Sequence, residues 1–387
     1  MKNLFKQSGP KLISTIVVVI VAAIPLTTAP LPTYAQHDIP LPEPVTGAAT
    51  IVTADPWLHN PYFDNDIWYE FHLRHAPSYP KGVWLPDGNW YGDPQDWRLW
   101  FQDGTSLVDC DPHSTDKHSG SHSVQCRAID PSAHIVTGLY QIVPNVVPCR
   151  TYQFQMYSKS RPKESNDLLN GLRVGIAPTG WGLDPDHAPG VHDGDWPATM
   201  AWGAYRYETG AYLPLVATAE ALNTTITVFS YADAVGGNSH KIHWDTTSLQ
   251  DVTPAELLSD PDNPSGSSSG ISGLTVDNIT TISARVRWNT SSEAISQVYY
   301  RFIPTPSPPV TPTGTLLYAV YLPFISNQQR HSWNHTTLTD SAQTYHSVQL
   351  TDLLPGSTYA YIVAARGVSG SACVTWVKEG TFTTREN

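Results

Sequence analysis

Aromatic side chains on polar, turn-rich segments are the residues of this sequence with the clearest chemical use. The 387 residues include 13 Trp and 19 Tyr. A ring on a loop offers a flat apolar face, sugar rings present matching C–H faces, and aromatic contacts cost little conformational entropy. Such rings predict a carbohydrate-binding surface, and packing of the same rings into a core is the alternative. The Trp residues that lie among Pro, Gly and Asp are Trp84, Trp90, Trp97, Trp100, Trp181 and Trp196.

The segment 84–100 combines these rings with acids and amides. It shows neither the alternation of a half-buried strand nor the three-to-four-residue repeat of a core helix, and long loops are often functional. We expect its rings to stack on a sugar and its polar side chains to bind hydroxyl groups. The alternative is that the rings fold inward and fix the loop. The predicted site residues are Trp84, Trp90, Trp97, Asp87 and Asn89.

Patterns for catalysis are weak. Residues 266–270 (GSSSG) fit the Gly-x-Ser-x-Gly pattern, but they lie in a low-complexity stretch and not between a strand and a helix. A glycosidase needs two opposed carboxylates, and 34 acidic residues single out no pair. We assign no catalytic residue and expect no enzyme activity, with a cryptic glycoside hydrolase as an alternative.

Four cysteines allow three pairings. Cys110 and Cys126 flank a polar, hairpin-like segment and are the predicted disulfide, which would contribute about 3 kcal/mol. Cys149 lies in a turn and Cys373 near the end of the chain, so we expect both to be unpaired.

The N-terminus resembles a secretory signal. Lysines precede an apolar run that is short for a membrane span, and small residues end it at Ala35. We expect residues 1–35 to be removed, leaving a secreted protein without a membrane span. They hold three Lys and no acid, so their loss takes the formal net charge from −12 to about −15. That charge argues against nucleic acid as a partner and suits neutral polymers or cations.

The rest of the chain predicts two all-β domains. Residues 36–50 are a Pro-rich lead, and residues 51–251 hold many short β-like runs separated by Gly, Pro and Asp. Residues 252–270 end in a Pro-, Ser- and Gly-rich stretch and predict a flexible linker. Residues 271–387 hold clear strands, including 282–288 and 298–303.

The last domain resembles fibronectin type III domains. Residues 353–359 (LLPGSTY) are similar to the segment in which a Tyr hydroxyl fixes the turn between two strands, and Trp288 also fits the family. The insertion 304–344 departs from it and holds the apolar run Leu316–Ile325, which predicts an edge strand or a docking strand for a protein partner. Similar domains precede the catalytic domain of purple acid phosphatases, but no metallophosphatase ligand set follows, so we do not expect that activity.

The first domain resembles jelly-roll carbohydrate-binding modules of families 4, 9 and 22 over about residues 55–250. Two positions depart from the family pattern, Asp64 in place of Glu and Cys149 in place of Gly. The matching segments, in order, are 60–64 (NPYFD), 118–124 (HSGSHSV), 138–143 (GLYQIV), 149–154 (CRTYQF) and 243–249 (HWDTTSL).

This resemblance implies a structural calcium between the first and last strands. Asp64 and Asp245 match its carboxylate positions, and the backbone at Ser119 and Ser121 matches its carbonyl position. The alternative is that both aspartates cap turns. Together the observations predict an all-β, jelly-roll and fibronectin type III-like protein that is secreted and binds a polysaccharide or cell-surface glycan without catalysis. The alternative function is an extracellular structural or adhesion protein that binds another protein.

Overall fold

The computed structural model describes part of the chain, all of it within one compact unit, Ala54–Asn387. All regular elements there are strands, as predicted, and no described segment is a long apolar helix of the kind that crosses a membrane. The signal and lead segments, the apolar run Leu316–Ile325 and several predicted site residues lie outside this part. The described residues are 57–59, 61–63, 68–70, 92–94, 97–102, 108–128, 134–161, 168–181, 190–191, 196–207, 210–235, 241–304 and 332–387.

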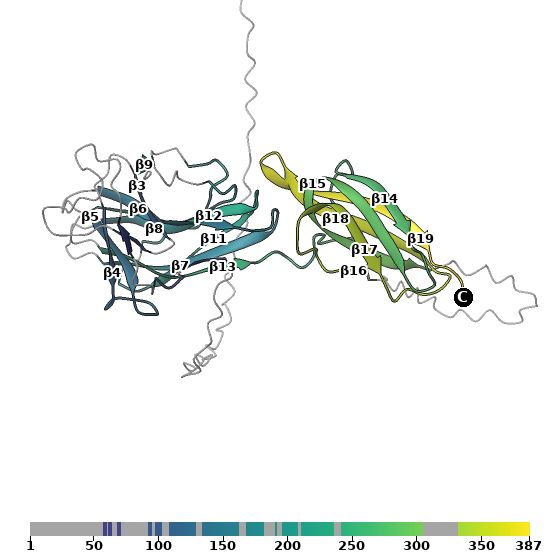
Figure 1. The fold of residues 1–387 in the computed structure, drawn as a ribbon, viewed down its shortest axis with the longest axis horizontal. Helices are drawn as coiled ribbons and strands as arrows, with labels where there is room; N and C mark the ends of the chain where they lie inside the picture. Colours follow the sequence, from purple (N-terminus) through teal and green to yellow (C-terminus); the bar gives the residue numbers. More distant parts are fainter. Residues whose placement is uncertain are drawn as a thin grey trace, which may run out of the picture. The chain divides into compact units, whose positions relative to one another are not determined.

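The first domain is a jelly-roll sandwich of two sheets (Figure 1). One sheet has the order β10 (Ala201–Trp202), β8 (Leu168–Ala177), β12 (Thr225–Val235), β6 (His134–Pro144), β3 (Arg98–Gln102) and β9 (Gly190–Val191). The other has the order β11 (Leu213–Glu220), β7 (Thr151–Arg161), β13 (Lys241–Asp251), β5 (Ser123–Ala128) and β4 (Val108–His113). A separate pair joins β1 (Trp68–Glu70) and β2 (Gly92–Pro94).

Alternation along the strands builds the core between these sheets. On β7, Tyr152, Phe154 and Met156 face inward and are fully buried. On β8, Val174 and Ile176 meet them from the opposite sheet. Because successive side chains point to opposite faces, the residues between them form the outer face of each sheet.

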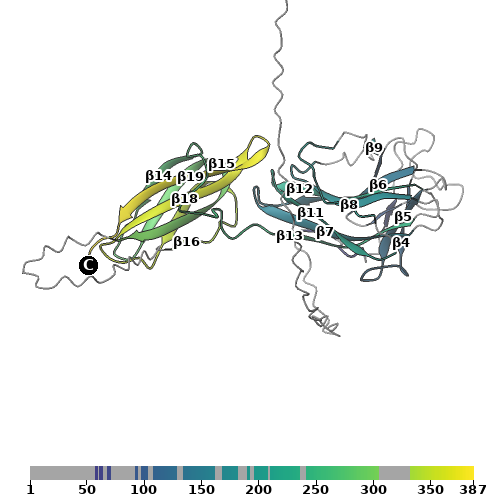
Figure 2. The same ribbon diagram turned by 180° about the vertical axis from the view of Figure 1, so that it is seen from behind.

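The second domain is a sandwich built around one long strand, with which four others pair. Its elements are β14 (Ile271–Asp277), β15 (Ala284–Ile303), β16 (Asn334–His335), β17 (Gln343–Leu350), β18 (Thr358–Ser369) and β19 (Ala372–Thr383). The sequence predicted two strands, 282–288 and 298–303. They form one strand, β15, whose register shifts between Asn289 and Ala294. Its first part pairs with β14 and its last part with β18. Figure 2 shows the sandwich from behind, with β18 and β19 side by side.

The predicted tyrosine corner is confirmed. The N–H of Leu354 donates to the Tyr359 hydroxyl over 2.8 Å, and Gly356 between them has φ 59°. The first sandwich holds a second, unpredicted corner in residues 146–152 (VVPCRTY). There the N–H of Val147 donates to the Tyr152 hydroxyl over 2.9 Å. Cys149 occupies the position of the glycine, with φ 62°.

Residues 252–270 lie against the second sandwich, in contrast to the flexible linker that their composition predicted. Leu258 is buried beside Tyr299, whose hydroxyl accepts a hydrogen bond from the Leu258 N–H over 2.8 Å. The absence of a side chain at Gly270 leaves room for the Trp376 indole, which a Cβ would approach within 2.2 Å. One buried leucine and one close glycine contact therefore hold a stretch whose Pro and Ser content alone suggested mobility.

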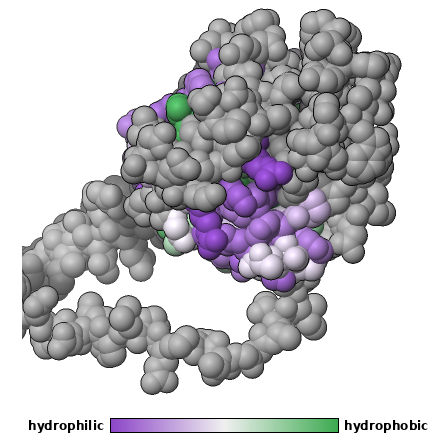
Figure 3. All heavy atoms as spheres, turned by 90° about the vertical axis from the view of Figure 1, so that its left-hand side faces the viewer, coloured by the Kyte–Doolittle hydropathy of each residue, from purple (hydrophilic) through white to green (hydrophobic). Residues whose placement is uncertain are grey.

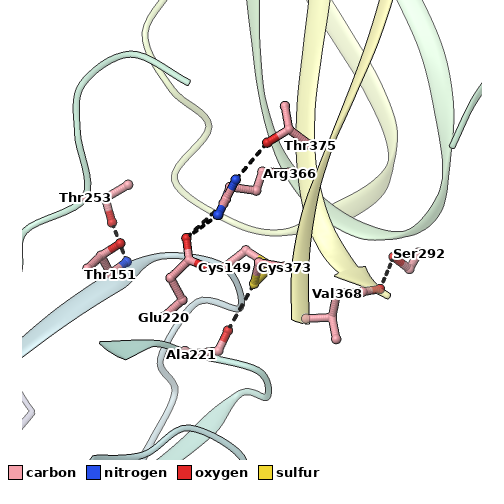
Figure 4. Close-up of a disulfide and its surroundings, with 10 residues drawn as sticks. All are labelled: Cys149, Thr151, Glu220, Ala221, Thr253, Ser292, Arg366, Val368, Cys373 and Thr375. Atoms are coloured by element: carbon pink, nitrogen blue, oxygen red, sulfur yellow. Dashed lines mark hydrogen bonds and ion pairs between the residues drawn. A yellow bond between two sulfur atoms is a disulfide. The ribbon is translucent and has the colours of Figure 1, made fainter. Parts of the chain in front are cut away.

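Both pairs of cysteines are bonded. Cys110 and Cys126 lie opposite each other on β4 and β5 and form the predicted disulfide. The expectation that Cys149 and Cys373 are unpaired was wrong, because they form a second disulfide between the two sandwiches (Figure 4). Their separation of 224 residues explains why no local pattern indicated the bond.

Candidate functional site

The outer face of the six-stranded sheet carries a row of aromatic residues. On β12, Ile226 and Val228 face the core, so Phe229 and Tyr231 lie on the outer face. The register places Phe229 between Tyr140 of β6 and Gly175 of β8. These rings are the base of the candidate site.

Tryptophans cover this base and fix it. Trp196 packs edge-on against Trp100, Phe229 and Trp202, with ring centroids 5.1, 5.4 and 4.8 Å apart. The Trp100 indole N–H donates to the Ser230 carbonyl over 3.0 Å. The rings of this layer are therefore packed on one another as a second apolar cluster outside the main core.

Three further rings form what we call the aromatic platform: Trp202, Tyr205 and Tyr207. Tyr205 and Tyr207 are 37% and 61% exposed, and their rings stack with centroids 6.0 Å apart. The rings of Trp202 and Tyr205 lie directly on β8, where a Cβ at Gly175 or Gly171 would come within 2.5 and 2.4 Å of them. The two glycines thus let the platform approach the sheet backbone closely.

Arg173 of β8 lies under the platform. Its Cζ is 4.0 Å from the ring centroid of Trp202, 4.3 Å from that of Tyr205 and 4.6 Å from that of Tyr231. Nε is buried and has no hydrogen-bond partner. Burial lowers the pKa of the guanidinium, and the nearby tyrosines partly offset the shift. The arginine remains a cation held between π faces.

A polar group borders the platform on the same sheet. Asp233 of β12 accepts from the Asn170 amide over 2.7 Å, and its carboxylate lies 2.7 Å from His134 Nε2. Carboxylate, amide and imidazole groups beside exposed rings suit a ligand that has hydroxyl groups.

The sequence predicts that Trp97 binds sugar from a loop, but in the structure its ring is buried. Trp97 is only 1% exposed, its indole N–H donates to the His59 carbonyl over 3.1 Å, and its ring packs against Phe63 and Phe154. The reason is that Trp97 lies two residues before Leu99 at the start of β3, so alternation turns both side chains into the main core. The other predicted sugar-binding residues, Trp84, Trp90, Asp87 and Asn89, lie outside the described residues.

Sequence reasoning missed Arg173, Trp202, Tyr205 and Tyr207. Two signals could have indicated the three rings and the open strand face, but not Arg173 itself. Residues 201–207 (AWGAYRY) bring three rings close together around a glycine, and β8 carries two glycines four residues apart, which leaves one strand face open.

The aspartate predicted to bind calcium is buried among hydrogen-bond donors. Asp245 Oδ2 accepts from the N–H groups of His118 and Ser119 over 2.6 and 3.2 Å. Its Oδ1 accepts from the Thr246 N–H over 2.6 Å. Burial raises the pKa of Asp245, and these donors partly offset the shift.

The described residues do not form a calcium cage at Asp245. The structure brings Ser119 to Asp245 through an N–H and not through a carbonyl, and the Ser121 carbonyl accepts from Lys117 Nζ over 3.1 Å. No group of three or more metal-binding side chains occurs among the described residues. Asp64 lies outside them, so the calcium site stays a prediction.

A serine, a histidine and an aspartate meet near the segment that connects β4 to β5. Ser123 Oγ is 3.5 Å from His243 Nδ1, and His243 Nε2 is 3.7 Å from Asp116 Oδ2. All three are buried, and the Ser123 hydroxyl donates to the Asp116 carbonyl over 2.6 Å. This arrangement resembles a hydrolytic triad only in composition, because a substrate cannot reach the enclosed hydroxyl.

An ion pair holds this cluster together. Lys159 Nζ donates to Asp116 Oδ1 over 2.7 Å. Burial by itself would raise the pKa of Asp116, but the Lys159 hydrogen bond and the neighbouring positive charges outweigh it and hold the pKa below its usual value.

Figure 3 looks onto the side of Figure 1 where β4 and β5 are labelled, and the described residues on that face are mostly hydrophilic.

Comparisons with known proteins give one family match and several solved structures of low identity. Residues 272–384 match the family described as purple acid phosphatase, N-terminal domain. No curated protein matches the chain. Among solved structures, TmCBM61 in complex with beta-1,4-galactotriose is 13% identical, covering 51% of this chain and 99% of that one, with a TM-score of 0.30.

Two more solved structures are similar at the same low level. The CBM22-1 xylan-binding domain of Paenibacillus barcinonensis Xyn10C is 14% identical over 42% of this chain and 90% of its own, with a TM-score of 0.27. The chicken CNTN1 FN1–FN3 domains are 11% identical over 73% and 99%, with a TM-score of 0.24. In the part that the structure describes, the chain is all-β, with a jelly-roll sandwich followed by a fibronectin type III-like sandwich.

Proposed function

We propose that this is a secreted, non-catalytic glycan-binding protein that holds a polysaccharide on the aromatic platform of its jelly roll. The observation that carries the proposal is the pair of exposed, stacked rings of Tyr205 and Tyr207 beside Trp202. Exposed apolar rings that cluster on one face of a sheet mark binding surfaces more often than isolated ones do.

Contacts within the protein hold two of the three platform rings in place. Trp202 is fixed by Trp196 and by Arg173, and Tyr205 packs against Tyr231 with centroids 6.0 Å apart. A ring that is already immobile loses little entropy on binding, so more of its contact energy is available for affinity. Stacking of a sugar on each ring contributes about 1 kcal/mol, by analogy with other aromatic contacts.

The polar border, as far as the structure describes it, suits a ligand that has hydroxyl groups. Cleavage of a glycosidic bond requires two carboxylates on opposite sides of that bond. Asp233, the carboxylate at the border, is already engaged by His134 and Asn170. Such a fixed group suits the orientation of a sugar.

Export fits the cysteine chemistry. Both disulfides would persist in an oxidising compartment, and the predicted signal in residues 1–35 would direct the chain there. The second sandwich then acts as a spacer or docking unit joined to the jelly roll. Docking of a protein partner through Leu316–Ile325 stays a prediction, because that run lies outside the described residues.

The test is retention of the full chain on a panel of polysaccharides, compared with Trp202→Ala and Tyr207→Ala. The matched control is Tyr345→Ala, which removes a ring that is 51% exposed on the second sandwich. We expect each platform variant to bind about fivefold more weakly and the control to bind like the parent. Tyr207→Ala should keep the parent's melting temperature, whereas Trp202→Ala should lower it, because the Trp202 ring packs on Trp196 and Arg173. Equal binding by all four proteins, or no binding by the parent, would refute the proposal.

A further inference from the structure

We propose that the platform is selective for anionic glycans, and that Arg173 binds the carboxylate or sulfate group of an acidic sugar residue. This inference rests on the proposed function and names the class of ligand for the same site.

The first argument is the set of groups around Arg173. Within the described part of the chain, its guanidinium contacts three aromatic rings and makes no hydrogen bond or ion pair. Nε is buried without a partner, and the side chain as a whole is half-buried and not enclosed. Aromatic faces hold a guanidinium in place but accept none of its hydrogen bonds in full, so its N–H donors remain available to a ligand.

Six other arginines of the chain have carboxylate partners. The ion pairs are Arg150–Asp251, Arg161–Asp116, Arg285–Asp277, Arg287–Asp277, Arg301–Asp262 and Arg366–Glu220. The chain has 34 acidic residues against 22 basic ones, so carboxylate partners are abundant. Among the described residues no carboxylate pairs with Arg173, so these leave its positive charge uncompensated at the base of the site.

The second argument is geometric. A guanidinium presents parallel N–H donors that match the two oxygens of a carboxylate or sulfate, and charge-assisted bonds of this kind are stronger than neutral ones. The contacts with Trp202 and Tyr205 hold the Arg173 guanidinium 4.0 and 4.3 Å from the centroids of the rings on which the sugar would stack. An acidic sugar could therefore use ring stacking and ion pairing at the same time.

The acidic net charge of the protein does not oppose this reading at short range. At physiological ionic strength, exposed charges more than about 8 Å apart are largely screened. Near the platform, the negative charge of Asp233 is shared with His134 and Asn170. The positive charge of Arg173 therefore determines the interaction with the bound ligand, and the net charge of the protein affects mainly the rate of association.

The experiment measures binding of the full chain to polymers that differ in charge alone. The probes are polygalacturonate with its carboxyl-reduced form, and a sulfated galactan with its desulfated form. We expect at least one charged polymer to bind about tenfold more tightly than its neutral form. Preference for the first pair assigns the carboxylate, and preference for the second assigns the sulfate.

Variants then link the preference to the residue. Arg173→Gln should lose the preference and Arg173→Lys should keep part of it, because lysine retains the charge without the paired donors. Arg385→Gln removes the same charge from an exposed position of the second sandwich and should change nothing. If Arg173→Gln fails to fold, the parent's comparison of charged and neutral polymers decides alone.

Equal binding of charged and neutral polymers would overturn the inference and leave the proposed function standing. The inference is also overturned if Arg173→Gln folds and keeps the full preference for charge. Failure of the parent to bind any polysaccharide would overturn the proposed function as well, so the two failures can be told apart.

Discussion

Cys149 of the first sandwich is bonded to Cys373 of the second, across 224 residues of sequence. The bond lies beside an ion pair in which Nε and Nη2 of Arg366 donate to Glu220 Oε1 over 2.9 and 2.6 Å (Figure 4). Arg150, next to Cys149, donates to the carbonyl of Thr339 over 2.7 Å. A covalent bond and two arginine contacts therefore join the jelly roll to the sandwich that follows it.

Loss of this disulfide should separate the unfolding of the two sandwiches. Closing a loop of this length restricts the unfolded chain by up to about 5 kcal/mol in the chain-entropy description. We expect Cys373→Ser to lower the melting temperature and to split one calorimetric transition into two. Cys110→Ser serves as the comparison, since its loop is short and lies within one sandwich. A single unshifted transition for Cys373→Ser would contradict the expectation.

The backbone at Cys149 permits a finer test of the same bond. Cys149 has φ 62°, a conformation that costs a residue with a side chain about 1 kcal/mol but costs glycine almost nothing. Cys149→Gly should therefore be about 1 kcal/mol less destabilising than Cys149→Ser, although both lose the disulfide. Chemical denaturation of the two variants measures the difference, and equal midpoints would show that the corner relaxes when the bond is absent.

The two tyrosine corners should contribute similar stability. Tyr359→Phe and Tyr152→Phe each remove the acceptor for one backbone N–H, that of Leu354 and that of Val147. Each change should cost about 1 kcal/mol, because one hydrogen bond is lost and its donor is left partly buried. Tyr345→Phe, at an exposed position, should stay within about 0.5 kcal/mol of the parent. The measurement is the denaturation midpoint of each variant. A midpoint of Tyr359→Phe or Tyr152→Phe equal to that of Tyr345→Phe would contradict a stabilising role for that tyrosine hydroxyl.

Local patterns predicted the strands and one corner well, because alternation and the segment 353–359 are properties of neighbouring residues. The long disulfide and the platform depend on residues that are distant in sequence. Trp97 shows what local patterns miss. Pro and Asp nearby suggested a loop, whereas the side chain packs on Phe154, 57 residues away in the sequence. Arg173 could not have been singled out, because its significance lies in rings contributed by other segments, including those of Trp202 and Tyr231.

Asp245 should be important for stability with or without a metal. Asp245→Ala leaves the N–H groups of His118, Ser119 and Thr246 without their acceptor, which should cost about 3 kcal/mol. The calcium prediction adds a separate expectation: chelator lowers the melting temperature of the parent, and added calcium restores it by mass action. A parent that does not respond to chelator would contradict calcium binding and leave the hydrogen-bond role of Asp245 intact.

Two buried histidines should make both sandwiches sensitive to acid. Burial lowers the pKa of His243 in the jelly roll to about 4, a shift that the nearby Asp116 partly opposes. Burial likewise lowers the pKa of His346 in the second sandwich to about 4. The His346 ring stacks on Trp288, and its Nδ1 lies 2.8 Å from Ser296 Oγ, so an added proton would disturb a fully packed site.

The direction of the effect follows from where the protons bind. In the unfolded chain a histidine titrates near pH 6.5, whereas the folded protein resists protonation of these two until about pH 4. The contribution of these histidines to the free energy of unfolding is therefore fully present above pH 6.5. It falls as the pH drops from 6.5 to 4, by about 1.4 kcal/mol per pH unit for each histidine. His346→Gln should flatten this slope for the second sandwich, even if the variant is less stable at pH 8. His335→Gln, at an exposed position of the same sandwich, should keep the parent's slope. Urea denaturation at pH 8, 7, 6 and 5 makes the comparison, and a slope unchanged in His346→Gln would mean that another group controls the acid response.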